Sequence, residues 1–184
     1  IRNYRANQII NTFSFFIQPG ESMLSVGDGD GYVSMRIKEK TGIEVQGLDI
    51  LPHQEYRVIG VPLTLYDGNN IPFPDKSFDI TAGIFLLHHC EDDTILKEMI
   101  RVSKKKIIIV EDVFNNSLER LGLRIFDCVE NRTFSSEMPI PHNFRKLKQW
   151  EKIFKLRDLE LVRSTQFRAL PLPVRNQSFC LIKR

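Results

Sequence analysis

Apolar residues recur every three or four positions near the start of the chain, the spacing that places side chains on one face of an α-helix. The recurring positions are Ala6, Ile9, Ile10, Phe13, Phe16 and Ile17. The repeat ends before Pro19-Gly20, a pair that commonly follows a helix, so we predict an amphipathic helix that covers one face of the segments after it. A second repeat, at 95–102, follows Asp92 and Asp93, which can cap a helix.

Short apolar runs bounded by turn residues predict strands between these helices. The runs lie at 23–26, 43–50, 58–65, 78–87 and 107–110. Strands that are apolar on both faces and alternate with helices indicate a parallel sheet covered by helices on both sides. We therefore predict an α/β fold of the Rossmann-like, doubly wound kind, in a single domain over residues 1–184.

The alternation stops in the segment 114–148, which we interpret as an insertion. It contains one predicted helix at 118–128 and an irregular, proline-containing stretch at 138–145. This stretch is a candidate lid over the substrate, although a packed loop held by its prolines explains it equally well. Two further strands, at 159–167 and 178–182, are expected to form a hairpin at one edge of the sheet.

Composition narrows the class of protein. Hydrophobic residues make up 42% of the chain and charged residues 27%, as in soluble globular domains, and the net charge of +3 does not require a nucleic-acid partner. Cys90, Cys128 and Cys180 are odd in number and widely spaced, so we expect free thiols in a reducing, cytoplasmic compartment. We see no membrane span and no signal peptide, and we expect a few residues to precede Ile1.

A glycine-rich loop, Val26-Gly27-Asp28-Gly29-Asp30-Gly31, joins the first predicted strand to a predicted helix. Alternating glycines let the backbone turn sharply and approach a ligand closely, and the start of the helix can hold an anionic group. A dinucleotide-binding fingerprint would have a glycine in place of Tyr32. Asp28 and Asp30 would repel a pyrophosphate, whereas they suit the sulfonium and ammonium groups of S-adenosylmethionine. The loop therefore favours S-adenosylmethionine over NAD.

Two acids follow the next two predicted strands. Asp49 ends the second strand, where a carboxylate can accept hydrogen bonds from ribose hydroxyls. Asp67 follows the third, where it could accept a hydrogen bond from the amino group of an adenine. Either acid alone could instead cap a turn or a helix. Together, at the ends of successive strands, they favour a ligand crevice.

Several segments resemble the motifs of class I S-adenosylmethionine-dependent methyltransferases, especially the branch that includes ubiquinone and menaquinone biosynthesis methyltransferases. The segments are Leu24-Ser25-Val26-Gly27-Asp28-Gly29-Asp30-Gly31, Gly47-Leu48-Asp49-Ile50, the stretch 67–79, Leu86-Leu87-His88-His89 and the stretch 96–102. The resemblance implies a mostly parallel sheet of seven strands whose last strand is antiparallel. Ser25 stands where the family usually has an acid, and Lys104-Lys105-Lys106 replaces a proline and glycine turn.

The resemblance also implies the cofactor, S-adenosyl-L-methionine, with S-adenosyl-L-homocysteine as the product. In this reading Asp49 binds the ribose, and Asp67 and Gly68 face the adenine. The residues predicted to contact the cofactor are Ser25, Gly27, Asp28, Gly29, Gly31, Asp49, Ile50, Asp67, Gly68 and Phe85.

Methyl transfer is an in-line displacement, so alignment of the reactants supplies much of the rate and a dedicated base is optional. The candidate bases, where the acceptor must lose a proton, are His89, Glu111, Asp112 and His142. Acceptor contacts are expected from Tyr4, His142, Phe144 and Arg145. We predict no metal site, because neighbours in the run from His88 to Asp92, taken as one strand, would point to opposite faces.

The sequence thus predicts a methyltransferase of EC class 2.1.1 acting on a small-molecule acceptor, with a homo-oligomer left open. One alternative is a noncatalytic relative that serves as a binding or partner subunit, because Ser25 breaks the pattern and no base stands out. A second, less favoured alternative is an RNA methyltransferase that uses a basic stretch. That stretch contains Arg145, Lys146, Lys148, Lys152, Lys155 and Arg157.

Overall fold

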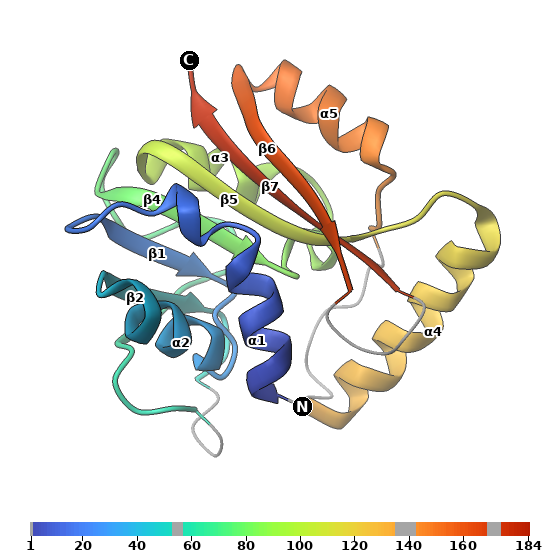
Figure 1. Ribbon diagram of the computed structural model, residues 1–184, viewed down its shortest axis with the longest axis horizontal. Coiled ribbons are helices and arrows are strands. Elements are labelled where there is room, and N and C mark those ends of the chain that lie inside the picture. Colours follow the sequence, from blue (N-terminus) through green and yellow to red (C-terminus); the bar gives the residue numbers. More distant parts are fainter. Residues whose placement is uncertain (1, 53–56, 135–142, 169–173) are drawn as a thin grey trace.

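The structure, a computed structural model, describes residues 2–52, 57–134, 143–168 and 174–184, and in this part of the chain seven strands form one sheet (Figure 1). The strands are β1 (Ser22–Val26), β2 (Glu44–Asp49), β3 (Leu63–Leu65), β4 (Phe78–Ile84), β5 (Ser103–Val113), β6 (Leu159–Phe167) and β7 (Arg175–Lys183). The α-helices are α1 (Arg2–Asn11), α2 (Tyr32–Thr41), α3 (Thr94–Val102), α4 (Ser117–Phe134) and α5 (Leu147–Leu156). Two short 3₁₀ turns are η1 (Ser14–Phe16) and η2 (Leu87–His89).

The strands lie in the order β3-β2-β1-β4-β5-β7-β6. Neighbours from β3 to β5 are parallel, whereas β7 pairs antiparallel with both β5 and β6. The predicted fold class is confirmed, including the antiparallel last strand and the hairpin at the sheet edge. From β1 the chain adds β2 and β3 on one side and then β4 and β5 on the other, so the direction of strand addition changes between β1 and β4. Ligands bind at this switch point in such sheets.

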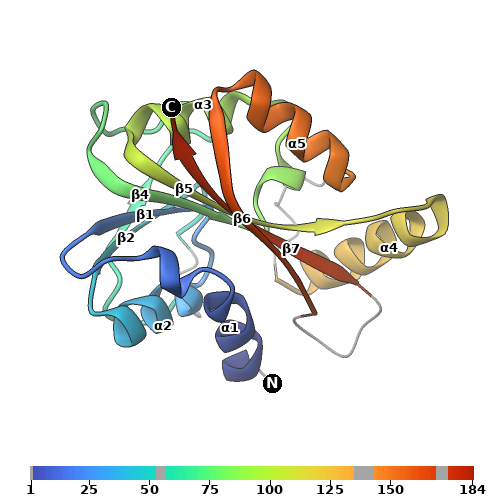
Figure 2. The same ribbon diagram turned by 45° about the horizontal axis from the view of Figure 1, so that its top comes forward.

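Helices cover both faces of the sheet, because the central strands are apolar on both sides. In β5, Ile107 and Ile109 belong to one buried cluster together with residues of α3 and α5, while Ile108 and Val110 belong to another with residues of α1 and α2. Figure 2 shows α1 and α2 on one face and α3 and α5 on the other. Such two-sided burial explains why the strands read as continuous apolar runs.

Several predicted elements have different bounds in the structure; the fourth strand, for example, ends at Ile84 and not at residue 87. The first helix ends at Asn11 and is followed by η1, instead of continuing to residue 17. The third strand covers only Leu63–Leu65, because the backbone N–H of Val58 donates to the carbonyl of Asp30 and ties that segment to the glycine loop. The fifth strand begins four residues earlier than predicted, at Ser103.

Two of the three lysines at the start of β5 form ion pairs with acids of neighbouring segments. Lys104 Nζ lies 2.8 Å from Asp79 Oδ1, and Lys106 Nζ lies 2.7 Å from Glu21 Oε1. The chain therefore passes from α3 into β5 with no proline and glycine turn.

The predicted insertion supplies α4, whose exposed face carries Leu118, Leu121 and Ile125. Residues 135–142, which include most of the proposed lid, lie outside the described residues. None of the helices that the structure describes is long and apolar enough to cross a membrane.

Two glycine substitutions should change stability in opposite directions. Gly42 ends α2 with a left-handed φ of 72°, so Gly42→Ala should lower the free energy of unfolding by about 1–2 kcal/mol. Gly122 is exposed within α4 and a Cβ there would meet nothing within 4 Å, so Gly122→Ala should raise it by about 0.5–1 kcal/mol. Urea unfolding of both variants measures the difference, and equal effects would contradict it.

Candidate functional site

A cavity of about 830 Å³ opens at the carboxyl ends of β1, β2 and β4. The loops after these strands, the turn η2, helix α4 and one residue of α1 line it. The lining residues that the argument uses are Arg5, Gly27, Gly29, Asp30, Asp49, Tyr66, Asp67, Phe85, His88, His89, Asp112 and Asp127. The cavity lies at the switch point of the sheet, where the acids after successive strands were expected to meet.

Asp49 lies on the cavity wall and accepts hydrogen bonds from two loops. One of its carboxylate oxygens accepts the backbone N–H of Gly29 at 2.7 Å, and the other accepts that of Leu51 at 3.0 Å. The side chain is buried yet reaches the cavity. It thereby links the glycine loop to the loop that follows its own strand.

The glycine loop needs a residue without a Cβ at Gly27. Its φ is 66°, in the left-handed region, and a Cβ there would lie 2.6 Å from Leu86 Cδ1. Its backbone N–H donates to the carbonyl of Leu48 at 2.8 Å, which holds the loop against the end of β2. Gly29, which also has a left-handed φ, is the second loop glycine on the cavity wall.

Three residues predicted to contact the cofactor do not line the cavity: Ser25, Asp28 and Gly31. Ser25 is buried within β1, between β2 and β4. Gly31 caps the start of α2. These three residues lie off the cavity wall, and their contacts with the cofactor stay predictions.

Asp28 points away from the cavity into a buried ion pair. Its carboxylate lies 2.8 Å from the guanidinium of Arg57 and accepts the hydroxyl of Ser34, and the side chain is 1% exposed. The charge of Arg57 compensates that of Asp28, so the argument that Asp28 repels a pyrophosphate was wrong. Asp30, which pairs with Arg2, does line the cavity.

Asp67 caps a turn and also lies on the cavity wall, where its contact with the adenine stays a prediction. Its carboxylate accepts the backbone N–H groups of Asn70 and Asn69, and the bonds from Asn70 come first among the causes that lower its pKa to about 2. The residue caps its own turn and remains on the cavity wall with its neighbour Gly68. Ile50 lines the cavity as well.

Phe85 lines the cavity with an unusual backbone conformation. Its φ of 54° is rare for a residue with a side chain, and its N–H donates to the carbonyl of Val110 at 2.7 Å. The guanidinium of Arg5 lies 5.2 Å from the centre of the Phe85 ring. Backbone strain of this kind is frequent where a side chain must be held at a binding site.

A buried pair behind the cavity was missed in the sequence. Glu111, fully buried at the end of β5, accepts the backbone N–H of Leu87 at 2.6 Å and lies 2.7 Å from His88 Nδ1. Burial disfavours the charged imidazolium, but the charge of Glu111 and hydrogen bonds with Asp127 and Glu111 outweigh it and raise the pKa of His88. An acid directly after the apolar run 107–110 was the available signal.

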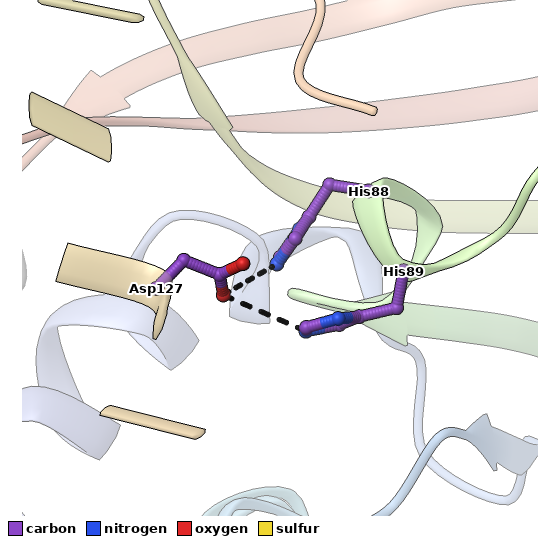
Figure 3. Close-up of side chains that lie close together, drawn as sticks. All are labelled: His88, His89 and Asp127. Carbon is purple, nitrogen blue, oxygen red and sulfur yellow. Dashed lines mark ion pairs between the residues drawn. The ribbon is translucent and has the colours of Figure 1, made fainter. Parts of the chain in front are cut away.

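His88, His89 and Asp127 converge on the cavity wall (Figure 3). His88 Nε2 lies 3.5 Å from Asp127 Oδ1, and His89 Nε2 lies 3.9 Å from the same oxygen. The two histidines lie in the turn η2, so both rings can face α4. The expectation that they sit in a strand and point to opposite faces was wrong.

The four candidate bases have different positions. His89 and Asp112 line the cavity, and burial raises the pKa of Asp112 to about 7, while the charge of His88 opposes the rise. Glu111 does not line the cavity and contacts it only through His88. His142 lies outside the described residues.

The predicted acceptor contacts are not brought together at the cavity. Tyr4 is 59% exposed and does not line it. Phe144 is buried and stacks on His88 with ring centres 4.8 Å apart. Arg145 lies over Trp150 and 3.3 Å from Asp93. Phe144 therefore contacts the turn η2 through the His88 ring, and Arg145 contacts α5 through Trp150.

Part of this sequence matches a known protein family. The family model described as "Methyltransferase domain" matches residues 24–110, which run from β1 into β5 and include the glycine loop, Asp49 and Asp67. Residues 24–110 are therefore similar to a methyltransferase domain. The resemblance identified from the sequence motifs is therefore confirmed.

Several named methyltransferases are similar to this chain. Ajmaline N-methyltransferase of Rauvolfia serpentina is 25% identical over 160 residues, 71% of this chain and 55% of that protein. A ubiquinone/menaquinone biosynthesis C-methyltransferase of Stenotrophomonas maltophilia (strain R551-3) is 30% identical over 48% of this chain and 40% of its own length. The chain spans about half the length of these curated relatives.

A solved structure of an S-adenosylmethionine-dependent methyltransferase from Methanosarcina mazei has a TM-score of 0.71 at 19% identity and covers 93% of this chain and 96% of its own. The fold is thus that of S-adenosylmethionine-dependent methyltransferases.

The cavity fits S-adenosylmethionine. Its volume is in the usual range for small-molecule sites, and glycines on its wall permit close approach of a ligand. Seven carboxylates and one arginine are among the described residues that line it: Asp30, Asp49, Asp67, Glu91, Asp92, Asp112, Asp127 and Arg5. Such an excess of acids suits a cofactor with a sulfonium and an ammonium group.

Proposed function

We propose that this chain binds S-adenosylmethionine and transfers its methyl group to a small-molecule acceptor. The observation that carries the proposal is the cavity at the switch point of a methyltransferase domain, with Asp49 bonded to the loop of Gly29. Relatives named as methyltransferases of ajmaline and of quinone precursors support a small-molecule acceptor. We place the protein in EC class 2.1.1.

In this proposal the residues of the wall hold the cofactor by its parts. Asp49 accepts the ribose hydroxyls, Asp67 and Gly68 face the adenine, and the backbone at Gly27 and Gly29 lies along the amino acid group. When bound, the cofactor supplies a methyl group on a positively charged sulfur. The surrounding carboxylates favour a cation at this place, and the chain thereby orients the methyl group for in-line attack.

The acceptor is proposed to enter at the end of the cavity formed by η2 and α4. There His89 and Asp112 lie on the wall and are the proposed proton acceptors. The segment 114–148 remains a proposed lid, and its helix α4 contributes Phe126 and Asp127 to the wall. Three cysteines without disulfides support a reducing, cytoplasmic compartment.

Nucleic acid is not part of the proposal. The basic stretch that could contact RNA includes Arg145 and Arg157. Their guanidinium groups lie 3.3 Å and 3.5 Å from the carboxylate of Asp93. Arg145 is also buried. These side chains are engaged within the protein and do not form a continuous phosphate-binding surface with the lysines of α5.

Cofactor binding should stabilise the fold. At 100 times its dissociation constant, S-adenosylmethionine or S-adenosylhomocysteine should raise the free energy of unfolding by about 2.7 kcal/mol, because only the folded chain binds it. Thermal unfolding with and without each ligand measures the shift, with ATP as the control nucleotide. No shift at millimolar concentration of either ligand would contradict the proposal.

Turnover is tested separately with methyl-labelled cofactor and a pool of extracted metabolites. Label in a small molecule supports the proposed function. A thermal shift without any labelled product would contradict turnover while leaving cofactor binding intact, as expected for a partner subunit.

A further inference from the structure

The cluster of His88, His89 and Asp127 has the composition and spacing of a metal site. One ligand atom from each residue lies within 4.8 Å of the other two. The distances from Asp127 Oδ1 to the two Nε2 atoms are 3.5 Å and 3.9 Å. Two ligands of a tetrahedral ion with bonds of about 2.1 Å lie roughly 3.4 Å apart, so small side-chain movements would bring all three to one ion.

Glu111 orients His88 for such a role. Its Oε2 lies 2.7 Å from His88 Nδ1, which directs the other ring nitrogen, Nε2, to Asp127. A carboxylate on the rear nitrogen of a metal-binding histidine fixes the tautomer and makes the front nitrogen a stronger donor. Both His88 and Glu111 are buried, and Phe144 stacks on the His88 ring, so the ring cannot turn away.

The position of the cluster also favours a cation. Asp112, Glu91 and Asp92 line the same cavity, and Arg5 is the one arginine or lysine among its described lining residues. Neighbouring carboxylates attract a divalent ion, whose charge would stabilise them in turn. The cluster joins η2 to α4, two elements that are distant in the sequence.

We propose that His88, His89 and Asp127 bind one divalent transition-metal ion at the wall of the cavity. Two imidazoles and one carboxylate suit zinc, iron(II) or cobalt(II), whereas magnesium and calcium prefer sites made only of oxygen. Three protein ligands leave a coordination position for water or for an atom of the acceptor. When His89 binds the ion through Nε2 it has no nitrogen left to accept a proton, so in the metal-bound protein that proposed role falls to Asp112. Metal binding itself does not depend on the proposed methyl transfer.

The test is equilibrium dialysis of the untagged chain, first stripped with a chelator, against zinc or cobalt(II) ions alone. We expect one ion per chain, and an absorption spectrum of the cobalt form that shows nitrogen and oxygen ligands at low coordination number. His89→Gln and Asp127→Asn should each weaken binding at least tenfold. Glu111→Gln should weaken it about 10–100-fold, as loss of an orienting carboxylate does elsewhere.

Two controls separate this site from others. Asp75→Asn removes an exposed acid that does not line the cavity and should leave metal binding unchanged. Cys90→Ser removes a thiol of the cavity wall and should also retain one ion per chain. Circular dichroism and urea unfolding report whether each variant is folded.

Three results would overturn the proposal. The first is that the unmodified protein binds less than one ion per chain at saturation. The second is that folded His89→Gln and Asp127→Asn bind the metal as tightly as the unmodified protein. The third is that Cys90→Ser no longer binds the ion. Failure of cofactor binding with intact metal binding would instead overturn the proposed function alone.

Discussion

Asp28→Asn is expected to lower the free energy of unfolding by about 3–5 kcal/mol, because it leaves the guanidinium of Arg57 buried without its counter-charge. Arg57 and Asp28 have side chains only 11% and 1% exposed and lie 2.8 Å apart. Arg57 also donates to the carbonyl of Gly29, so the pair joins the segment that begins at Arg57 to the glycine loop. Urea unfolding measures the loss.

Glu44→Gln is the matched control for this prediction. It removes the acid of an ion pair with Lys38, in which the two side chains are 77% and 38% exposed. An exposed pair contributes less than about 1 kcal/mol, because water and salt screen both charges. If the free energy of unfolding fell by a similar amount in the two variants, the Asp28 pair would stabilise the fold no more than an exposed pair does.

Asp49→Ala should lower the affinity for S-adenosylhomocysteine by roughly 150-fold, or about 3 kcal/mol, through loss of two hydrogen bonds to a charged group. The same change leaves the backbone N–H groups of Gly29 and Leu51 without the carboxylate that now accepts them. Isothermal titration gives the affinity, and thermal unfolding without ligand gives the separate cost to the fold.

The control for Asp49→Ala is Asp75→Ala, which removes an exposed acid that does not line the cavity. It should leave the affinity within about twofold of that of the unmodified protein, since a surface charge this exposed is largely screened. If Asp49→Ala kept the affinity while the fold stayed intact, the proposed ribose contact would be refuted.

Local patterns predicted the parts of this fold that depend on neighbours in sequence. Apolar runs and turn residues located the strands, and the acids Asp49 and Asp67 were placed correctly at strand ends on the cavity wall. Strands that are buried on both faces form continuous apolar runs, and these runs and the turn residues between them can be recognised in the sequence. The glycines of the loop were recognised as a local motif that joins a strand to a helix.

Contacts between distant segments were not predictable in this way. Nothing near Asp28 indicated that Arg57 would neutralise it, and nothing near His88 indicated that Asp127 would approach from α4. Phe144 and Arg145 follow a proline-rich stretch typical of an exposed lid, yet they pack against His88 and Trp150. Such contacts depend on tertiary packing, which a period along the chain does not encode.

The bonds that shape the glycine loop have a kinetic consequence. Leu48, Asp49 and Arg57 all hold the loop through contacts made within the chain itself. A loop whose shape is set in this way loses little conformational entropy when a ligand arrives. Association should therefore vary little among variants of the wall, and their differences in affinity should appear mainly as differences in how long the cofactor stays bound.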